Sequence, residues 1–211
     1  MKIKVDLKIF LILIVYLLTR KIEILALSFI FIFIHELSHL TVGIVLGLKI
    51  KKVSINIAGL SIEFENYGEE RKLNRILIDI AGPLVNLGIF IVAIILKTEN
   101  IAYINFLIFI INIIPIYPLD GGRIVKNIML YTHTYKETMI KIEKISKGNL
   151  IILTFVSSLL ILYIKNIALF IFIIYLWYLV LKEDKKNRII QRVFKTIENN
   201  RWYWNYSTIM I

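Results

Sequence analysis

The sequence predicts an all-α polytopic membrane protein of about six transmembrane helices, with a short membrane-associated β-hairpin between the second and third helices. Three observations support this fold class. Hydrophobic residues make up 58% of the 211 residues. The mean hydropathy of +0.77 is well above that of a soluble domain. The apolar residues also gather in separate runs, and most of the Lys and Arg residues lie between alternate runs.

The expected spans follow the apolar runs, since a helix needs about 20 residues to cross a bilayer. These runs lie at 9–19, 24–48, 76–96, 101–119, 150–164 and 167–181. The first run follows lysines, as in a signal peptide, but no small-residue cleavage site comes after it, so we interpret it as a retained span. The last two runs are expected to be separate spans that turn at Lys165-Asn166, because one helix over both would be too long for the bilayer.

The distribution of positive charge predicts the orientation of these spans. With both termini in the cytoplasm, 22 of the 26 Lys and Arg residues lie in cytoplasmic segments, as the positive-inside rule requires. Contact with anionic lipid then accounts for the net charge of +11, and no nucleic-acid partner is expected. We expect residues 1–181 to form one intramembrane domain and residues 182–211 to form a basic amphipathic tail at the membrane surface.

The stretch between the second and third runs has the pattern of a β-hairpin. In KVSINIAGLSIEFE (52–65), apolar and polar residues alternate on both sides of Ala58-Gly59. An ordinary cytoplasmic loop is the alternative, because short alternations are common.

Two histidines and a glutamate lie inside the second apolar run, where ionisable groups cost about 2.5–3.5 kcal/mol each. The sequence there is His35-Glu36-Leu37-Ser38-His39, an HExxH motif. Residues four apart on a helix lie one turn above each other, so both imidazoles can hold one Zn²⁺, which offsets the cost of burial. Glu36 is placed to accept a proton from a water molecule at such a site. The alternative is a pair of buried histidines without a metal.

The third zinc ligand is expected to be Asp120. The chain has no cysteine, so this ligand must be His, Asp or Glu. Asn112, Pro115 and Pro118 interrupt the apolar run just before Asp120, and proline lacks an amide donor, so we expect non-helical backbone there. The two glycines that follow allow the backbone to approach a partner closely. The alternative role for Asp120 is an N-cap at the cytoplasmic interface.

Together these motifs resemble the site-2 protease family of intramembrane zinc metalloproteases. HELSH inside a span precedes NIIPIYPLDGG (112–122), and AGPLVNLG (81–88) between them also resembles that family. The resemblance is specific over residues 24–130 and looser over the six-span layout. Within the family, the chain is most similar to the sporulation branch, whose members cleave an inactive precursor of a sigma factor.

The resemblance implies a zinc endopeptidase that cuts a membrane-associated protein substrate near the cytoplasmic face. By their positions in the motifs, His35, His39 and Asp120 would be the ligands of one zinc ion per chain. Glu36 would be the catalytic base, and Asn112 would lie beside the substrate backbone or the oxyanion. Inhibitory membrane proteins are further candidate partners.

A transmembrane substrate is helical, whereas protease sites bind extended peptide. The predicted hairpin offers an exposed edge, and we expect an unwound substrate segment to add to it as a strand at Ile55 and Ile57.

Other polar residues have simpler explanations. We expect Asn86 to brace helix packing or to support the metal site. Asp79 is expected at the membrane interface, Arg123 as a cytoplasmic anchor and His133 in solvent.

Two other classes of function stay open on the sequence. A catalytically silent relative would act as a membrane scaffold, but it need not retain both histidines, Glu36 and Asp120. An ion or proton carrier would also bury ionisable groups. Carriers tend to show interrupted helices in two repeated halves, however, and this chain is interrupted once.

Overall fold

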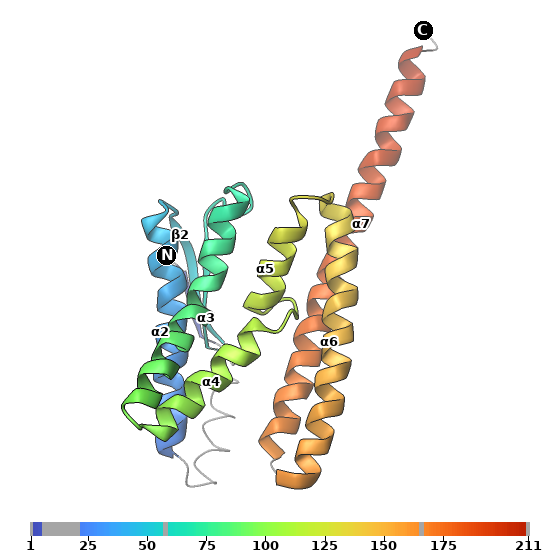
Figure 1. The fold of residues 1–211 in the computed structure, drawn as a ribbon. Coiled ribbons are helices and arrows are strands. Elements are labelled where there is room, and N and C mark those ends of the chain that lie inside the picture. Colours follow the sequence, from blue (N-terminus) through green and yellow to red (C-terminus); the bar gives the residue numbers. More distant parts are fainter. Residues whose placement is uncertain (1, 6–21, 57–58, 165–166, 210–211) are drawn as a thin grey trace. The chain divides into compact units, whose positions relative to one another are not determined.

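The computed structural model describes residues 2–5, 22–56, 59–164 and 167–209 (Figure 1). The elements in chain order are β1 (Lys2–Val5), α2 (Ile22–Val45), β2 (Ile50–Asn56), β3 (Gly59–Phe64), α3 (Lys72–Ile95), α4 (Glu99–Ile113), α5 (Asp120–Met129), α6 (Tyr135–Ile164) and α7 (Ile167–Ile209). The chain forms two compact units. The first comprises Met1–Pro115 and Leu119–Tyr131, and the second comprises Ile116–Pro118 and Thr132–Ile211.

The central helix of the first unit is α3, which packs against α2, α4 and α5. The core that these helices share contains polar as well as apolar side chains, and their outer surface is apolar. The buried polar residues are His35, His39, Asp79, Asn86, Asn105, Asp120 and Asn127. Large apolar side chains face outward instead, for example Phe33 (53% exposed) on α2 and Ile91 (50% exposed) on α3. Lipid favours this arrangement, because a bilayer solvates apolar side chains and excludes polar ones.

Two described helices are long and apolar enough to cross a bilayer, at Ala26–Val45 and Lys72–Ile95, and the apolar helix Glu99–Ile113 is shorter. The last two apolar runs lie in separate helices, α6 and α7, as predicted. Their turn at 165–166 and the first run at 9–19 lie outside the described residues, so the count of six spans stays a prediction.

The tail is helical, and its place at the membrane surface stays a prediction. Residues 182–209 continue α7 without a break and do not form a separate segment. The expected cytoplasmic segment 120–149 is also largely helical, since it contains α5 and the first half of α6.

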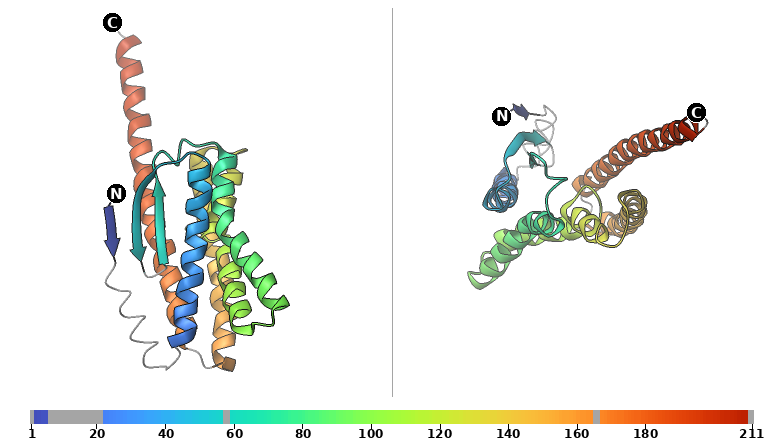
Figure 2. Two further views of the ribbon diagram at one scale, coloured as in Figure 1. Left: turned by 90° about the vertical axis from the view of Figure 1, so that its left-hand side faces the viewer. Right: turned by 90° about the horizontal axis from the view of Figure 1, so that it is seen from above.

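The predicted hairpin is confirmed, and a third strand extends it. Strands β2 and β3 pair antiparallel, and β1 pairs with β2 in parallel, with Val5 opposite Ile55. The strand order is β1-β2-β3, so β2 is the central strand and its outer edge is paired rather than exposed (Figure 2). A parallel partner distant in sequence leaves no turn signal beside it, which is why the local pattern predicts the hairpin alone. Phe64 of β3 packs where Gly43 of α2 has no side chain.

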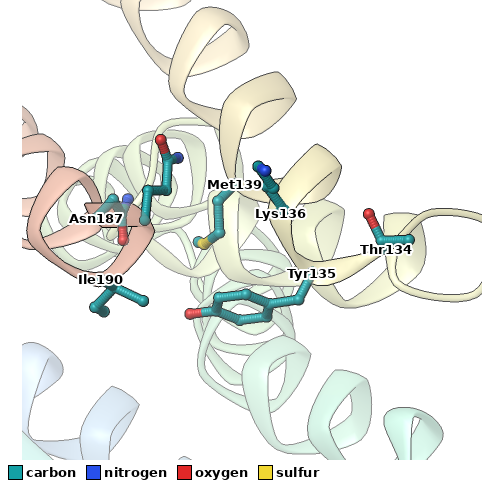
Figure 3. A pocket seen from close by; sticks show the side chains of 7 residues that line it. Thr134, Tyr135, Lys136, Met139, Asn187 and Ile190 are labelled. Carbon is teal, nitrogen blue, oxygen red and sulfur yellow. The ribbon is translucent and has the colours of Figure 1, made fainter. Parts of the chain in front are cut away.

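The second unit is the α6–α7 pair. Lys147 of α6 forms an ion pair with Asp184 of α7, with 2.7 Å between Nζ and Oδ2, and a second one with Glu143 at 2.6 Å. A cavity of about 200 Å³ lies beside the start of α6 (Figure 3). It is lined by Thr134, Tyr135, Lys136, Met139, Asn187, Ile190 and Gln191. None of these is a predicted site residue.

Candidate metal centre

The three predicted metal ligands meet in the first unit. His35 and His39 project from one face of α2, and Asp120 is the first residue of α5. Asp120 Oδ2 lies 2.9 Å from His35 Nε2 and 3.2 Å from His39 Nε2, and the two Nε2 atoms are 3.2 Å apart. All three residues are buried, and within the described part of the chain they form the one group of side chains suited to a metal ion.

The proton position on His35 follows from a chain of hydrogen bonds. His35 Nδ1 lies 2.5 Å from Asn86 Oδ1, and Asn86 Nδ2 donates to Asn105 Oδ1 at 2.8 Å. Asn105 Nδ2 in turn donates to the backbone carbonyl of Ile101 at 2.9 Å. Because a carbonyl can only accept, it fixes the orientation of both amides, and His35 Nδ1 must carry the proton. In the neutral imidazole, Nε2 then presents a lone pair to the site.

His39 has the same tautomer for a simpler reason. Its Nδ1 lies 2.6 Å from the backbone carbonyl of Ile78, which can only accept, so this nitrogen is the donor. The Nε2 atom of His39 therefore also presents a lone pair.

This donor set fits a zinc ion. With both imidazoles neutral, two lone pairs and a carboxylate oxygen converge, and they repel one another unless a cation lies among them. Their separations of 2.9–3.2 Å are close to those between ligands that each bind one zinc ion at about 2.0–2.2 Å. Three protein ligands leave a fourth position open, as in catalytic zinc sites. Hydrogen bonds to the outer nitrogen of each imidazole are also typical of such sites.

One face of α3 supports both imidazoles. Ile78, Gly82 and Asn86 are four residues apart and so lie along this face. Ile78 and Asn86 accept the two Nδ1 protons, and Gly82 leaves room between them. A Cβ at Gly82 would lie 2.6 Å from His35 Nε2 and closer still to His39 Nε2.

Asp120 follows a stretch of non-helical backbone, as predicted. Helix α4 ends at Ile113 and α5 begins at Asp120, so residues 114–119 connect them. The N-cap position of α5 is Leu119, so Asp120 does not act as an N-cap, and its carboxylate faces the histidines. Gly121 lets the two helices meet closely, because a Cβ there would overlap the backbone carbonyl of Ile113.

Glu36 is half-buried beside the ligands. Its carboxylate interacts electrostatically with His35, His39 and Asp120. No hydrogen bond among the described residues occupies this carboxylate. It is therefore free to accept a hydrogen bond from a water molecule at the site.

The other predicted site residues do not join the ligand group, except Asn86. Asn112 lies in the last turn of α4, and its Nδ2 donates to the carbonyl of Ile108 in the same helix. Ile55 lies in the central strand β2, and Ile57 lies outside the described residues. Roles for these three residues in substrate binding stay predictions.

The structure gives two charged residues a partner that the sequence did not predict. Asp79 is fully buried within the protein, and it pairs with Arg123 at 2.6 Å, so Arg123 is more than a surface anchor. The position of Asp79 at the membrane interface stays a prediction. The sequence interpretation also missed Asn105, which orients Asn86. The only sequence signal for Asn105 is that it is an isolated amide in an apolar run. Such residues often form hydrogen bonds between membrane helices.

Comparisons with known proteins agree with this geometry. Residues 98–157 match the family model of Peptidase family M50. Stage IV sporulation protein FB of Bacillus subtilis is 28% identical over 117 residues, which cover 51% of this chain and 41% of that protein. The zinc metalloprotease MJ0392 of Methanocaldococcus jannaschii is 26% identical over 186 residues, which cover 82% of this chain and 52% of that protein.

Among solved structures, the Site-2 Protease from Methanocaldococcus jannaschii matches with a TM-score of 0.66 and 25% identity, over 86% of this chain and 89% of that chain. The fold of this chain is therefore similar to that of a site-2 protease. More particularly, the comparisons confirm the resemblance to the site-2 proteases of Peptidase family M50. The chain spans about half or less of the length of the two curated relatives.

Proposed function

We propose that this chain is a zinc-dependent intramembrane endopeptidase that cuts a membrane-associated protein substrate near the cytoplasmic face. The observation that carries this proposal is the convergence of His35 Nε2, His39 Nε2 and Asp120 Oδ2 in a buried site, with the Glu36 carboxylate beside it. A multi-pass arrangement with both termini in the cytoplasm belongs to the same proposal and is supported by the charge distribution.

When bound, zinc supplies a Lewis acid that polarises a peptide carbonyl and makes a neighbouring water molecule more acidic. Glu36 accepts the proton of the attacking water on its carboxylate and then donates it to the departing amine nitrogen. Ile78 and Asn86 hold the two Nδ1 protons, so both imidazoles keep their Nε2 lone pairs directed into the site. The buried surroundings exclude competing water and strengthen these electrostatic interactions.

Glu36→Gln is the most direct test of this mechanism. The amide cannot accept the proton, so we expect cleavage to fall by at least about 10²–10⁴-fold while zinc binding is retained. Glu23→Gln is the matched control, because Glu23 lies in the exposed first turn of the same helix and should be neutral. Equal cleavage by the Glu36→Gln variant and the wild type would contradict this mechanism. A cellular role that the substitution leaves unchanged, with no cleavage by either form, would favour a scaffold, and absence of bound zinc in the wild type would favour a carrier.

One relative supports a proposal for the substrate class. Stage IV sporulation protein FB is named for sporulation, and we extend the proposal to an inactive sigma-factor precursor as the substrate. The experiment is co-expression of the chain with a candidate precursor, in wild-type and Glu36→Gln forms. Processing by the wild type alone supports this substrate, and the same precursor left intact by both forms contradicts it.

We further propose that an unwound substrate segment adds to the sheet near Ile55 and Ile57. The packing of Phe64 against Gly43 supports this, because Gly43 lies one turn after His39 and so places the sheet beside the ligand helix. Since β1 occupies the outer edge of β2, a substrate strand must replace it there.

Removing residues 1–5 should therefore increase cleavage, and Ile55→Pro, which disrupts strand pairing, should reduce it. Both changes are measured as the rate of product formation in detergent. Unchanged cleavage in both variants would rule out strand addition at this edge.

A further inference from the structure

Asp79 is a fully buried carboxylate that is not one of the predicted ligands. A buried charge destabilises a protein unless nearby donors satisfy it. Three residues do so here. Arg123 Nη2 lies 2.6 Å from Asp79 Oδ1, and Asn127 Nδ2 donates to Oδ2 at 2.7 Å. The Tyr67 hydroxyl lies 2.8 Å from both oxygens. We refer to Tyr67, Asp79, Arg123 and Asn127 as the Asp79 cluster.

The Asp79 cluster ties the short helix α5 to α3. Arg123 and Asn127 are four residues apart and project from the same side of α5. Tyr67 lies in the loop before α3, and the Arg123 guanidinium lies over its ring, 5.5 Å from the centroid. Burial raises the pKa of Tyr67 to about 12, so its hydroxyl remains a hydrogen-bond donor at neutral pH.

Arg123 also reaches the predicted ligand Asp120. Its Nη1 lies 3.7 Å from Asp120 Oδ1, whereas Asp120 Oδ2 faces the two imidazoles. The two oxygens of this carboxylate therefore have different neighbours, which restricts its rotation. The backbone before Asp120 is non-helical, so α4 does not hold it through a continuous helix. The Asp79 cluster supplies that restraint.

We propose that Asp79 is a positioning residue for the metal site, which acts through Arg123 to hold Asp120 Oδ2 toward the two imidazoles. The inference rests on the proposed function, since it concerns the same zinc site. A purely structural role would differ in one respect. It would lower the stability of the protein but leave the geometry of a bound metal unchanged.

The test compares Asp79→Asn with Asp184→Asn in the full chain in detergent. Asp184 is a matched control, because it is also a buried carboxylate paired with a cation, but in the second unit. We expect Asp79→Asn to weaken zinc binding, measured by competition with a chelator, by about 10–100-fold. After substitution with Co²⁺, the visible absorption bands should also shift, because they report ligand geometry. Asp184→Asn should leave both unchanged.

Two further variants keep the proposal testable if Asp79→Asn does not fold. Tyr67→Phe removes one donor and should weaken zinc binding by about fivefold. Arg123→Lys keeps the charge but lacks the planar fork that contacts both carboxylates, so it should also shift the Co²⁺ bands.

If every variant that folds binds zinc as tightly as the wild type and shows the wild-type Co²⁺ spectrum, the proposed role of Asp79 is overturned. The proposed function would remain intact in that case. Conversely, a Glu36→Gln variant that still cleaves would contradict the proposed function, while a weakened metal site in Asp79→Asn would still support this inference.

Discussion

The buried polar side chains of the two units differ in kind. In the first unit, buried amides and charged groups surround the three predicted ligands, and nearly all of them are connected by hydrogen bonds. In the second unit, the α6–α7 pair buries aliphatic side chains such as Leu150 and Leu176, together with three hydroxyl side chains, Asp184 and Asn187. Buried polar groups contribute less to stability than apolar ones of similar size, and in the first unit they surround the candidate metal site. Substitutions in the two units should therefore have separable effects.

Gly82→Ala should have the largest effect on the metal site. The new methyl group would occupy the space beside both Nε2 atoms, so we expect the purified variant to contain almost no zinc. The number of zinc ions per chain is measured by elemental mass spectrometry. Gly88→Ala is the matched control on the same helix, because a Cβ there meets nothing within 4 Å. A full complement of zinc in Gly82→Ala would show that the ion binds elsewhere.

Asn86→Ala should have an intermediate effect. It removes the acceptor of the His35 Nδ1 proton, and we expect zinc affinity to fall by about 10–100-fold. Asn105→Ala removes only the partner that orients Asn86, so its effect should be smaller. Competition with a chelator measures both. An Asn105→Ala variant that binds zinc more weakly than Asn86→Ala would contradict the order of this hydrogen-bonded chain.

Leu150→Ala should have the smallest effect on the site. Leu150 is fully buried in the second unit, and we expect its truncation to destabilise that unit by about 2–5 kcal/mol. Thermal unfolding in detergent and zinc content are measured on the same preparation. Loss of zinc together with stability would show that the two units do not respond separately.

The convergence of His35, His39 and Asp120 was predictable because each of these residues has a local signal. The four-residue spacing of His35 and His39 places them on one helix face, and the prolines before Asp120 interrupt the helix there. The β2–β3 hairpin was predictable for the same reason, since its alternation and central glycine are adjacent in sequence.

The supporting residues were not predictable, because their partners are distant in sequence. Asp79 and Arg123 each have a simple interfacial explanation until the fold brings α3 and α5 together. The parallel strand β1 is a similar case, since nothing beside Lys2–Val5 indicates its partner β2. Gly82 belongs to a motif resembling a known family, but its role as a gap between two imidazoles is visible only in three dimensions.

The most direct test of this account is X-ray absorption at the zinc edge on the purified full chain. We predict one zinc ion per chain, bound by two imidazole nitrogens and a carboxylate oxygen at about 2.0–2.2 Å. In the Asp120→Ala variant, the spectrum should lose the signal of the carboxylate ligand. A preparation without zinc, or a spectrum without imidazole ligands, would contradict the account.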